Sequence, residues 1–198
     1  MRHRKLWFAL ATVVFLSFLV LGGQGVEIAR KLPPIPEQVV TPDGAVLLRG
    51  ESIRRGQNVW QSIGGQQVGS VWGHGAYVAP DWSADWLHRE SLFILDTWAR
   101  GEGLGGYEEA PAERQAALRS RLAGLVRTNT YDERTGTVTL APERAEALRA
   151  NAAHYADVFS QGRAAYAIPM GALTDARKLE ELSAFFWWTS WVASTNRP

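Results

Sequence analysis

The chain has 198 residues, of which 46% are hydrophobic and 11% aromatic, and its formal net charge at pH 7 is +1. A charge so close to zero gives no electrostatic reason to expect nucleic acid as a partner. The sequence contains no cysteine, which excludes disulfides, cysteine-ligated zinc, iron–sulfur clusters and covalently attached c-type haem.

The first segment is a basic end followed by a long apolar run. Residues 1–5 read MRHRK, and no charged residue occurs from Leu6 to Val26. At a rise of 1.5 Å per residue, about 20 apolar residues cross the hydrocarbon core of a bilayer. We therefore predict a transmembrane anchor over residues 1–28, with its basic end in the cytoplasm and the remainder of the chain outside it. The alternative is a cleaved secretory signal peptide, although the apolar region is longer than is usual for one.

A spacer and a series of helices are expected after the anchor. Residues 31–36 read KLPPIP, and because X-Pro units resist helix formation, residues 29–49 are expected to form an extended linker. Residues 50–198 are expected to form one mostly α-helical domain. Two short β-prone runs, 128–131 and 137–140, predict a small β-hairpin. Apolar residues recur at helical spacing in the segments 50–63, 81–98, 111–125, 142–161 and 174–192.

The second of these helices carries a candidate metal cluster. Asp81, Asp85 and His88 share one helical face and could hold a metal ion, but a solvated first turn with a partly buried histidine is the commoner origin of such a spacing. No nucleophile elbow, zinc-protease motif or phosphate-binding loop motif occurs in the sequence. The sequence therefore gives no sign of a hydrolase site.

The loop over residues 60–77 is unusually rich in glycine and aromatic residues, and reads WQSIGGQQVGSVWGHGAY. It resembles the haem-attachment region of class I cytochromes c, where a helix with a glycine and an aromatic residue one turn apart leads into the haem-binding motif. Gly56 and Trp60 provide that pair here. More specifically, the strings WQS at 60–62 and GAY at 75–77 resemble the membrane-anchored cytochrome c subunit of bacterial nitric oxide reductase.

The haem-binding residues of that subunit are not retained in this chain. When the two strings are aligned, its two cysteines and its haem-ligating histidine fall on Gly65, Val68 and Gly69. Thioether links need two thiols and the iron needs a proximal ligand, so these three residues are interpreted as vestigial haem-attachment positions. Met170, which resembles the distal methionine of cytochromes c, is then expected to serve only in packing. Bulky side chains are expected to fill the vacated pocket. The candidates are Trp60, Val68, Trp72, Trp82 and Trp86.

Along nearly its whole length the chain resembles the N-terminal region of bacterial quinol-dependent nitric oxide reductases, a membrane anchor followed by a haem-free cytochrome c-like domain. Besides the loop, the similarity is carried by DWLHRE at 85–90, the hairpin near Tyr131, FFWW at 185–188 and TNRP at 195–198. The resemblance implies a non-catalytic cap on the periplasmic side of the inner membrane.

The resemblance also implies partners and cofactors. The partners are the lipid bilayer and the membrane-embedded catalytic helices, which hold haem b and a non-haem iron and reduce two NO to N2O with electrons from quinol. A homodimer is left open. No cofactor is expected within this segment other than calcium.

A calcium ion lies between the cap and the membrane part in that family, near haem propionates. The Gly-Ala-Tyr stretch contributes ligands there, which points to Gly75 and Tyr77. Backbone carbonyls are suitable hard oxygen ligands for calcium. The alternative is that Gly75 only permits a tight turn and that Tyr77 only packs.

Because the sequence lacks the catalytic helices, the chain is expected to be a fragment or a separately encoded portion of such an enzyme.

Two other functions are weighed against the cap. The alternative is a stand-alone, membrane-anchored periplasmic interaction module, with the Trp-rich last helix as its docking face. A haem-bearing electron-transfer cytochrome is opposed by the absence of cysteine.

Overall fold

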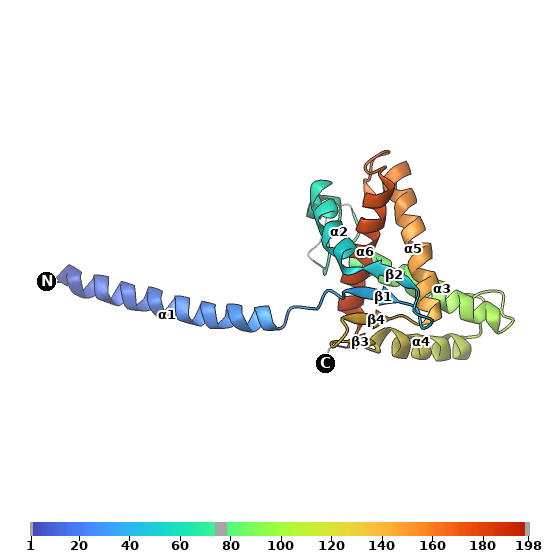
Figure 1. Ribbon diagram of the computed structural model, residues 1–198, viewed down its shortest axis with the longest axis horizontal. Coiled ribbons are helices and arrows are strands. Elements are labelled where there is room, and N and C mark those ends of the chain that lie inside the picture. The colour runs from blue at the N-terminus through green and yellow to red at the C-terminus, as the bar shows by residue number, and fades with distance from the viewer. Residues whose placement is uncertain (1, 74–78, 197–198) are drawn as a thin grey trace. The chain divides into compact units, whose positions relative to one another are not determined.

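The computed structural model describes residues 2–73 and 79–196, and the chain divides into two compact units, Met1–Pro34 and Ile35–Pro198. The first unit is dominated by helix α1, Arg2–Arg30 (Figure 1). Its stretch His3–Arg30 is strongly apolar, and the most apolar part of it is not buried against the rest of the chain. By length and composition α1 can therefore cross a membrane, as the apolar run predicts.

The second unit is mostly α-helical, which confirms the expected fold class. Two short 3-10 helices, η1 (Gly65–Val68) and η2 (Ala164–Tyr166), follow α2 and α5. The α-helices of its described residues are α2 (Gly50–Ser62), α3 (Trp82–Gly101), α4 (Ala112–Arg127), α5 (Pro142–Gln161) and α6 (Ala176–Ser194).

Helix α6 is the centre of this unit, packing on α2, α3 and α5 (Figure 1). Every residue from Glu181 to Val192 is buried, as expected for a helix that is apolar on all sides. Trp187 is 1% and Trp191 4% exposed. The Trp-rich helix is thus core, and the exposed docking face on which the interaction-module alternative relied is not found there.

The close crossing of α2 and α6 depends on a glycine. A Cβ atom at Gly56 would lie 1.9 Å from the Glu181 carbonyl oxygen and 2.8 Å from Cβ of Phe185. One turn later, the Trp60 ring packs on Phe185 with 5.6 Å between centroids. The glycine and aromatic residue of the sequence pattern therefore serve to pack the two helices together.

Gly56→Ala is expected to lower the free energy of unfolding by about 2–3 kcal/mol, because the added methyl group meets helix backbone that cannot move aside. The matched control is Gly124→Ala in α4, where no atom lies within 4 Å of the new Cβ and alanine favours the helix. Urea unfolding followed by near-UV circular dichroism compares the two variants. Equal stabilities would contradict the close crossing.

The second half of the expected linker, 29–49, forms strands instead. β1 (Gln38–Val40) pairs antiparallel with β2 (Val46–Arg49) and parallel with β4 (Thr137–Thr139). β4 also pairs antiparallel with β3 (Tyr131–Asp132), so the expected hairpin is present and forms half of a sheet with the order β2-β1-β4-β3 (Figure 1).

The sheet exists because its middle strands share a buried face. Val39 and Val138 are register partners, and both are 0% exposed. Burial of paired β-branched side chains favours strand over open linker. The pairing partner comes from a distant part of the sequence, so the local proline-rich pattern did not reveal it.

Candidate functional site

The glycine-rich loop after α2 is held by two indole rings. Trp60 Nε1 donates a hydrogen bond to the Gly69 carbonyl oxygen at 3.1 Å, and Trp82 Nε1 donates to the Val68 carbonyl oxygen at 3.1 Å. Both indoles are buried. The backbone at two of the three vestigial haem-attachment positions is therefore fixed against tryptophan side chains.

The space beside Gly69 is taken by Trp82. A Cβ atom at Gly69 would lie 2.1 Å from Trp82 Nε1 and 2.9 Å from the Pro80 carbonyl oxygen, and the residue has φ +125°. A histidine side chain does not fit there. Gly65 has room for a Cβ, but its φ of +55° is left-handed. Together with the missing thiols, this loop does not fit a c-type haem.

Aromatic rings fill the core next to the loop. Trp82 is 0% exposed and stacks on Phe186, with 5.1 Å between centroids and 14° between planes. Tyr155 and Tyr166 each meet Trp82 edge-on at 5.8 Å. Trp86, also 0% exposed, stacks on Tyr155 at 5.3 Å. The volume expected to hold bulky fillers is thus closely packed.

Not every expected filler takes part. Trp60, Trp82 and Trp86 are buried and Val68 is half-buried, whereas Trp72 is 44% exposed. The Trp72 indole lies at the surface of the domain, where its Nε1 donates a hydrogen bond to the Thr189 carbonyl oxygen at 3.0 Å.

Met170 does not serve in packing as expected. Its side chain is 80% exposed. It follows Pro169 in the turn after α5, where the backbone N–H groups of Gly171 and Leu173 donate to carbonyl oxygens of α5. The turn is closed by these backbone contacts, so the methionine side chain is left outside the core.

The calcium candidates Gly75 and Tyr77 fall in 74–78, outside the described residues. The chain on either side of this segment is anchored at one place. Ser70 N donates to the Pro80 carbonyl oxygen at 3.2 Å, and Trp82 N donates to the Ser70 carbonyl oxygen at 2.8 Å.

Asp81 strengthens the same anchor. Its Oδ2 accepts hydrogen bonds from Ser70 Oγ at 2.8 Å and from Gly73 N at 2.6 Å. Its Oδ1 accepts from Ala84 N at 3.0 Å and caps α3. The described residues on either side of 74–78 are therefore both fixed at the N-terminus of α3.

Asp81, Asp85 and His88 are not brought together as a metal site. Asp81 is the helix cap, Asp85 forms an ion pair with Arg89 at 2.9 Å, and His88 is exposed. Across residues 2–73 and 79–196, no three His, Cys, Asp or Glu residues form a group that could hold a metal ion. The expected solvated first turn with a partly buried histidine is also not what the structure shows, because the Asp85 side chain is 14% exposed and paired whereas His88 is exposed.

Asp85 is the centre of a polar network. Tyr155 Oη donates to Asp85 Oδ2 at 2.7 Å, and Arg89 donates to Tyr166 Oη at 2.7 Å. Burial raises the pKa of the Tyr155 phenol, and the charge of Asp85 raises it further, so Tyr155 remains a donor. Burial lowers the pKa of His154, and Arg89 adds to this effect.

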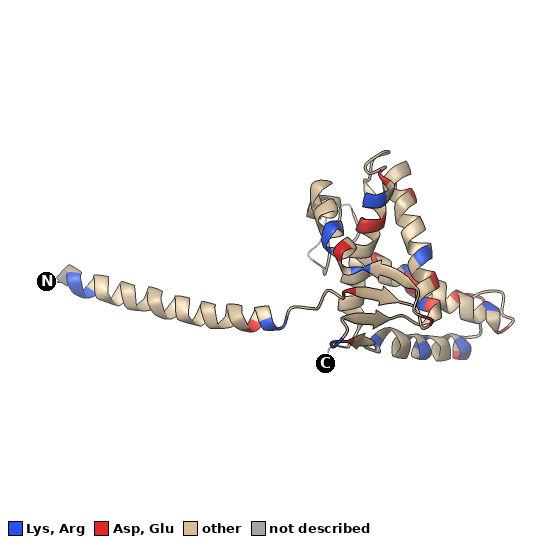
Figure 2. Cartoon of the chain, in the orientation of Figure 1, with Lys and Arg blue, Asp and Glu red and all other residues tan. Residues whose placement is uncertain are grey.

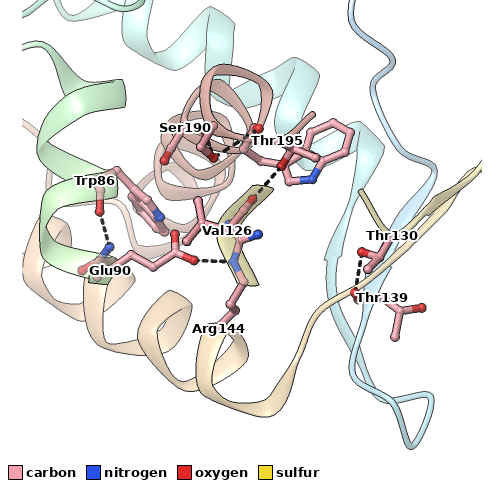
Figure 3. A network of polar contacts seen from close by, with 11 residues as sticks. Trp86, Glu90, Val126, Thr130, Thr139, Arg144, Ser190 and Thr195 are labelled. Carbon is pink, nitrogen blue, oxygen red and sulfur yellow. Dashed lines mark hydrogen bonds and ion pairs between the residues drawn. The ribbon is translucent and has the colours of Figure 1, made fainter. Parts of the chain in front are cut away.

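A buried ion pair joins α3 and α5 beneath α6 (Figure 3). Arg144 Nε donates to Glu90 Oε1 at 2.6 Å, and the two side chains are 4% and 2% exposed. Asn151 Nδ2 on α5 donates a hydrogen bond to the Trp86 carbonyl oxygen on α3 at 3.1 Å. Sequence reasoning missed this pair. The available signal was the spacing of Trp86, Glu90 and Ile94, which puts a carboxylate on the apolar face of α3.

The second compact unit is similar to a known protein family. A family model described as the NorB cytochrome c-like domain of nitric oxide reductase matches residues 36–198. A search of curated proteins gives no match. The matched range covers the second compact unit from its second residue and does not include α1. It therefore contains the glycine-rich loop, the two indoles of Trp60 and Trp82 that donate to its backbone, and the buried Glu90–Arg144 ion pair.

Proposed function

Because the chain belongs to the NorB cytochrome c-like domain family of nitric oxide reductase, we propose that it is the haem-free, non-catalytic cap of a quinol-dependent nitric oxide reductase. Such an enzyme reduces two NO to N2O with electrons from quinol. The cap packs on the membrane-embedded helices that carry haem b and non-haem iron. Its partners are these helices and the lipid bilayer.

The observation that carries this proposal is the packing of Gly69 on Trp82. A cytochrome that relays electrons from a soluble donor needs a redox group, because protein side chains of this kind cannot replace one. Here the loop offers neither the thiols nor room for a histidine at position 69. Loss of the relay agrees with electrons that arrive as quinol within the membrane.

The first unit supports a membrane location. Helix α1 is long and apolar enough to cross a bilayer, and together with the family this indicates association with a membrane. The basic residues before the apolar run favour a cytoplasmic N-terminus. The folded domain is then periplasmic, on the outer face of the bacterial inner membrane.

The test is to purify the chain in complex with the catalytic helices and to supply either a quinol or a reduced soluble cytochrome c. We expect NO reduction with the quinol, and a visible spectrum with b-type haem alone. The same chain without the helices, expressed with haem and the cytochrome c maturation machinery, should be folded and colourless. A stoichiometric Soret band from the chain alone, or preference for the soluble donor, would overturn the proposal. A folded chain that does not bind the helices would favour the stand-alone module.

We also propose that Gly75 and Tyr77 help to hold calcium where the cap meets the catalytic part. The supporting observation is that the described residues on either side of them, Gly73 and Pro80, are held by hydrogen bonds near the N-terminus of α3. Calcium takes about six to eight oxygen ligands, so the remaining ligands come from the catalytic part.

In the full enzyme, Gly75→Pro is expected to weaken calcium binding by roughly tenfold or more, because it changes the backbone that presents the carbonyl ligands. Tyr77→Phe should leave the domain folded and tests the phenol separately. Calcium per complex is measured by mass spectrometry after dialysis, with Tyr131→Phe on the hairpin as the control. An unchanged calcium content in every variant at positions 75 and 77 would exclude these residues as ligands.

A further inference from the structure

A groove separate from the vestigial haem-attachment positions opens between β2, α2, α5 and α6. Its volume is about 590 Å³, within the rough range of 300–1,000 Å³ typical of small-ligand sites. None of Gly65, Val68 and Gly69 lines it.

The inner wall of the groove is apolar. It includes the half-buried Leu47 and Leu48 on β2, and Leu148 on α5, which is 6% exposed. Trp86 also belongs to this wall, but it is 0% exposed and offers no open surface to a ligand. The leucines can therefore receive the apolar part of a ligand.

The rim of the groove has an excess of positive charge. Its charged residues are Arg49, Arg55, Arg149, Arg177, Glu180 and Glu181, and Figure 2 shows basic residues on β2, α5 and the first turns of α6. The buried Glu181 is already paired, with Arg55 Nε at 2.6 Å and Arg177 Nε at 3.6 Å.

Two arginines on this rim remain available. Arg49 at the end of β2 and Arg149 on α5 are exposed, and neither forms a salt bridge within the part of the chain that the structure describes. Guanidinium groups bind carboxylate and phosphate oxygens through charge-assisted, often bidentate hydrogen bonds. Glu180 is the one other unpaired charge among the described lining residues, so the unpaired charge of the lining is net positive. Outside the lining, the exposed Asp43 interacts with the charge of Arg149.

We propose that this groove binds an amphiphilic anion, with a phosphate or carboxylate headgroup between Arg49 and Arg149 and an apolar body against Leu47 and Leu148. Free charge at the rim and apolar surface in the wall match the two halves of such a molecule. The inference does not rest on the cap function, because the groove lies within the second unit alone.

The experiment measures binding of dodecyl phosphate to the full chain in an uncharged detergent by titration calorimetry. The double variant Arg49→Gln/Arg149→Gln is compared with Arg127→Gln/Arg134→Gln, which removes the same charge from two exposed arginines without salt bridges elsewhere on the described surface. We expect the dissociation constant for dodecyl phosphate to rise by roughly tenfold or more in the first variant and to stay unchanged in the second. Both variants keep α1, so adsorption of the amphiphile to that helix is the same in both.

Equal binding by the two double variants would overturn the proposal. So would inorganic phosphate that binds as tightly as dodecyl phosphate, since the apolar wall would then contribute nothing. Vesicles with phosphatidylglycerol distinguish the source of the headgroup. Vesicle binding that is lost in Arg49→Gln/Arg149→Gln identifies a membrane lipid, and binding of dispersed dodecyl phosphate alone identifies a soluble amphiphile.

Discussion

Replacing Arg144 with methionine is expected to lower the free energy of unfolding of the folded domain by about 3–5 kcal/mol. Methionine fills much of the same space, but it leaves Glu90 as a buried charge without its cation. Glu90 is 1% exposed, and its second oxygen has no partner among the described residues even in the intact pair. Urea unfolding followed by tryptophan fluorescence measures the change.

Two control variants separate burial from charge loss. In Glu90→Met/Arg144→Met both charges are absent, so the double variant should be much more stable than the sum of the single changes predicts. Arg100→Met breaks the Arg100–Asp96 pair, whose side chains are 67% and 35% exposed, and should cost at most about 1 kcal/mol. If Arg144→Met lowers the free energy of unfolding by no more than Arg100→Met does, the result would contradict the burial of the Glu90–Arg144 pair that the structure shows.

Replacing Gly69 with histidine is expected to lower the free energy of unfolding by about 4 kcal/mol, from overpacking and backbone strain together. The new Cβ would lie 2.1 Å from Trp82 Nε1, and the backbone at φ +125° is one that side-chain-bearing residues rarely adopt. The change also displaces the indole that holds the Val68 carbonyl oxygen.

The same variant tests whether the loop can be returned to a haem site. Gly65→Cys/Val68→Cys/Gly69→His, expressed with the cytochrome c maturation machinery, should give no stable haem protein while Trp82 is present. The control Gly65→Ala, which meets no atom within 4 Å, should cost only about 1–2 kcal/mol for its left-handed backbone. A histidine at 69 with wild-type stability, or haem bound by the triple variant, would contradict this view of the loop.

Several of these features were visible in the sequence. The charge-free run from Leu6 to Val26 determined an apolar helix, because helix length and hydropathy are local properties. The spacing of apolar residues determined a mostly α domain. The strings around the loop were specific enough to identify the family, which the family match over 36–198 confirms. The absence of cysteine, on which the interpretation of Gly65, Val68 and Gly69 as vestigial haem-attachment positions depends, is also a property of the sequence alone.

Other features were decided only by the tertiary structure, because they depend on residues that are far apart in the chain. β1 was expected to be part of a linker, and it is a strand because β4 pairs with it and buries Val39. Glu90 lies on the apolar face of α3, and Arg144, 54 positions later, pairs with its charge inside the core. The local periodicity of a sequence indicates which side of a helix is apolar. It does not indicate which charged group of another helix will pack against that side. The space beside Gly69 was likewise settled by Trp82, since only folding brings that indole against the loop.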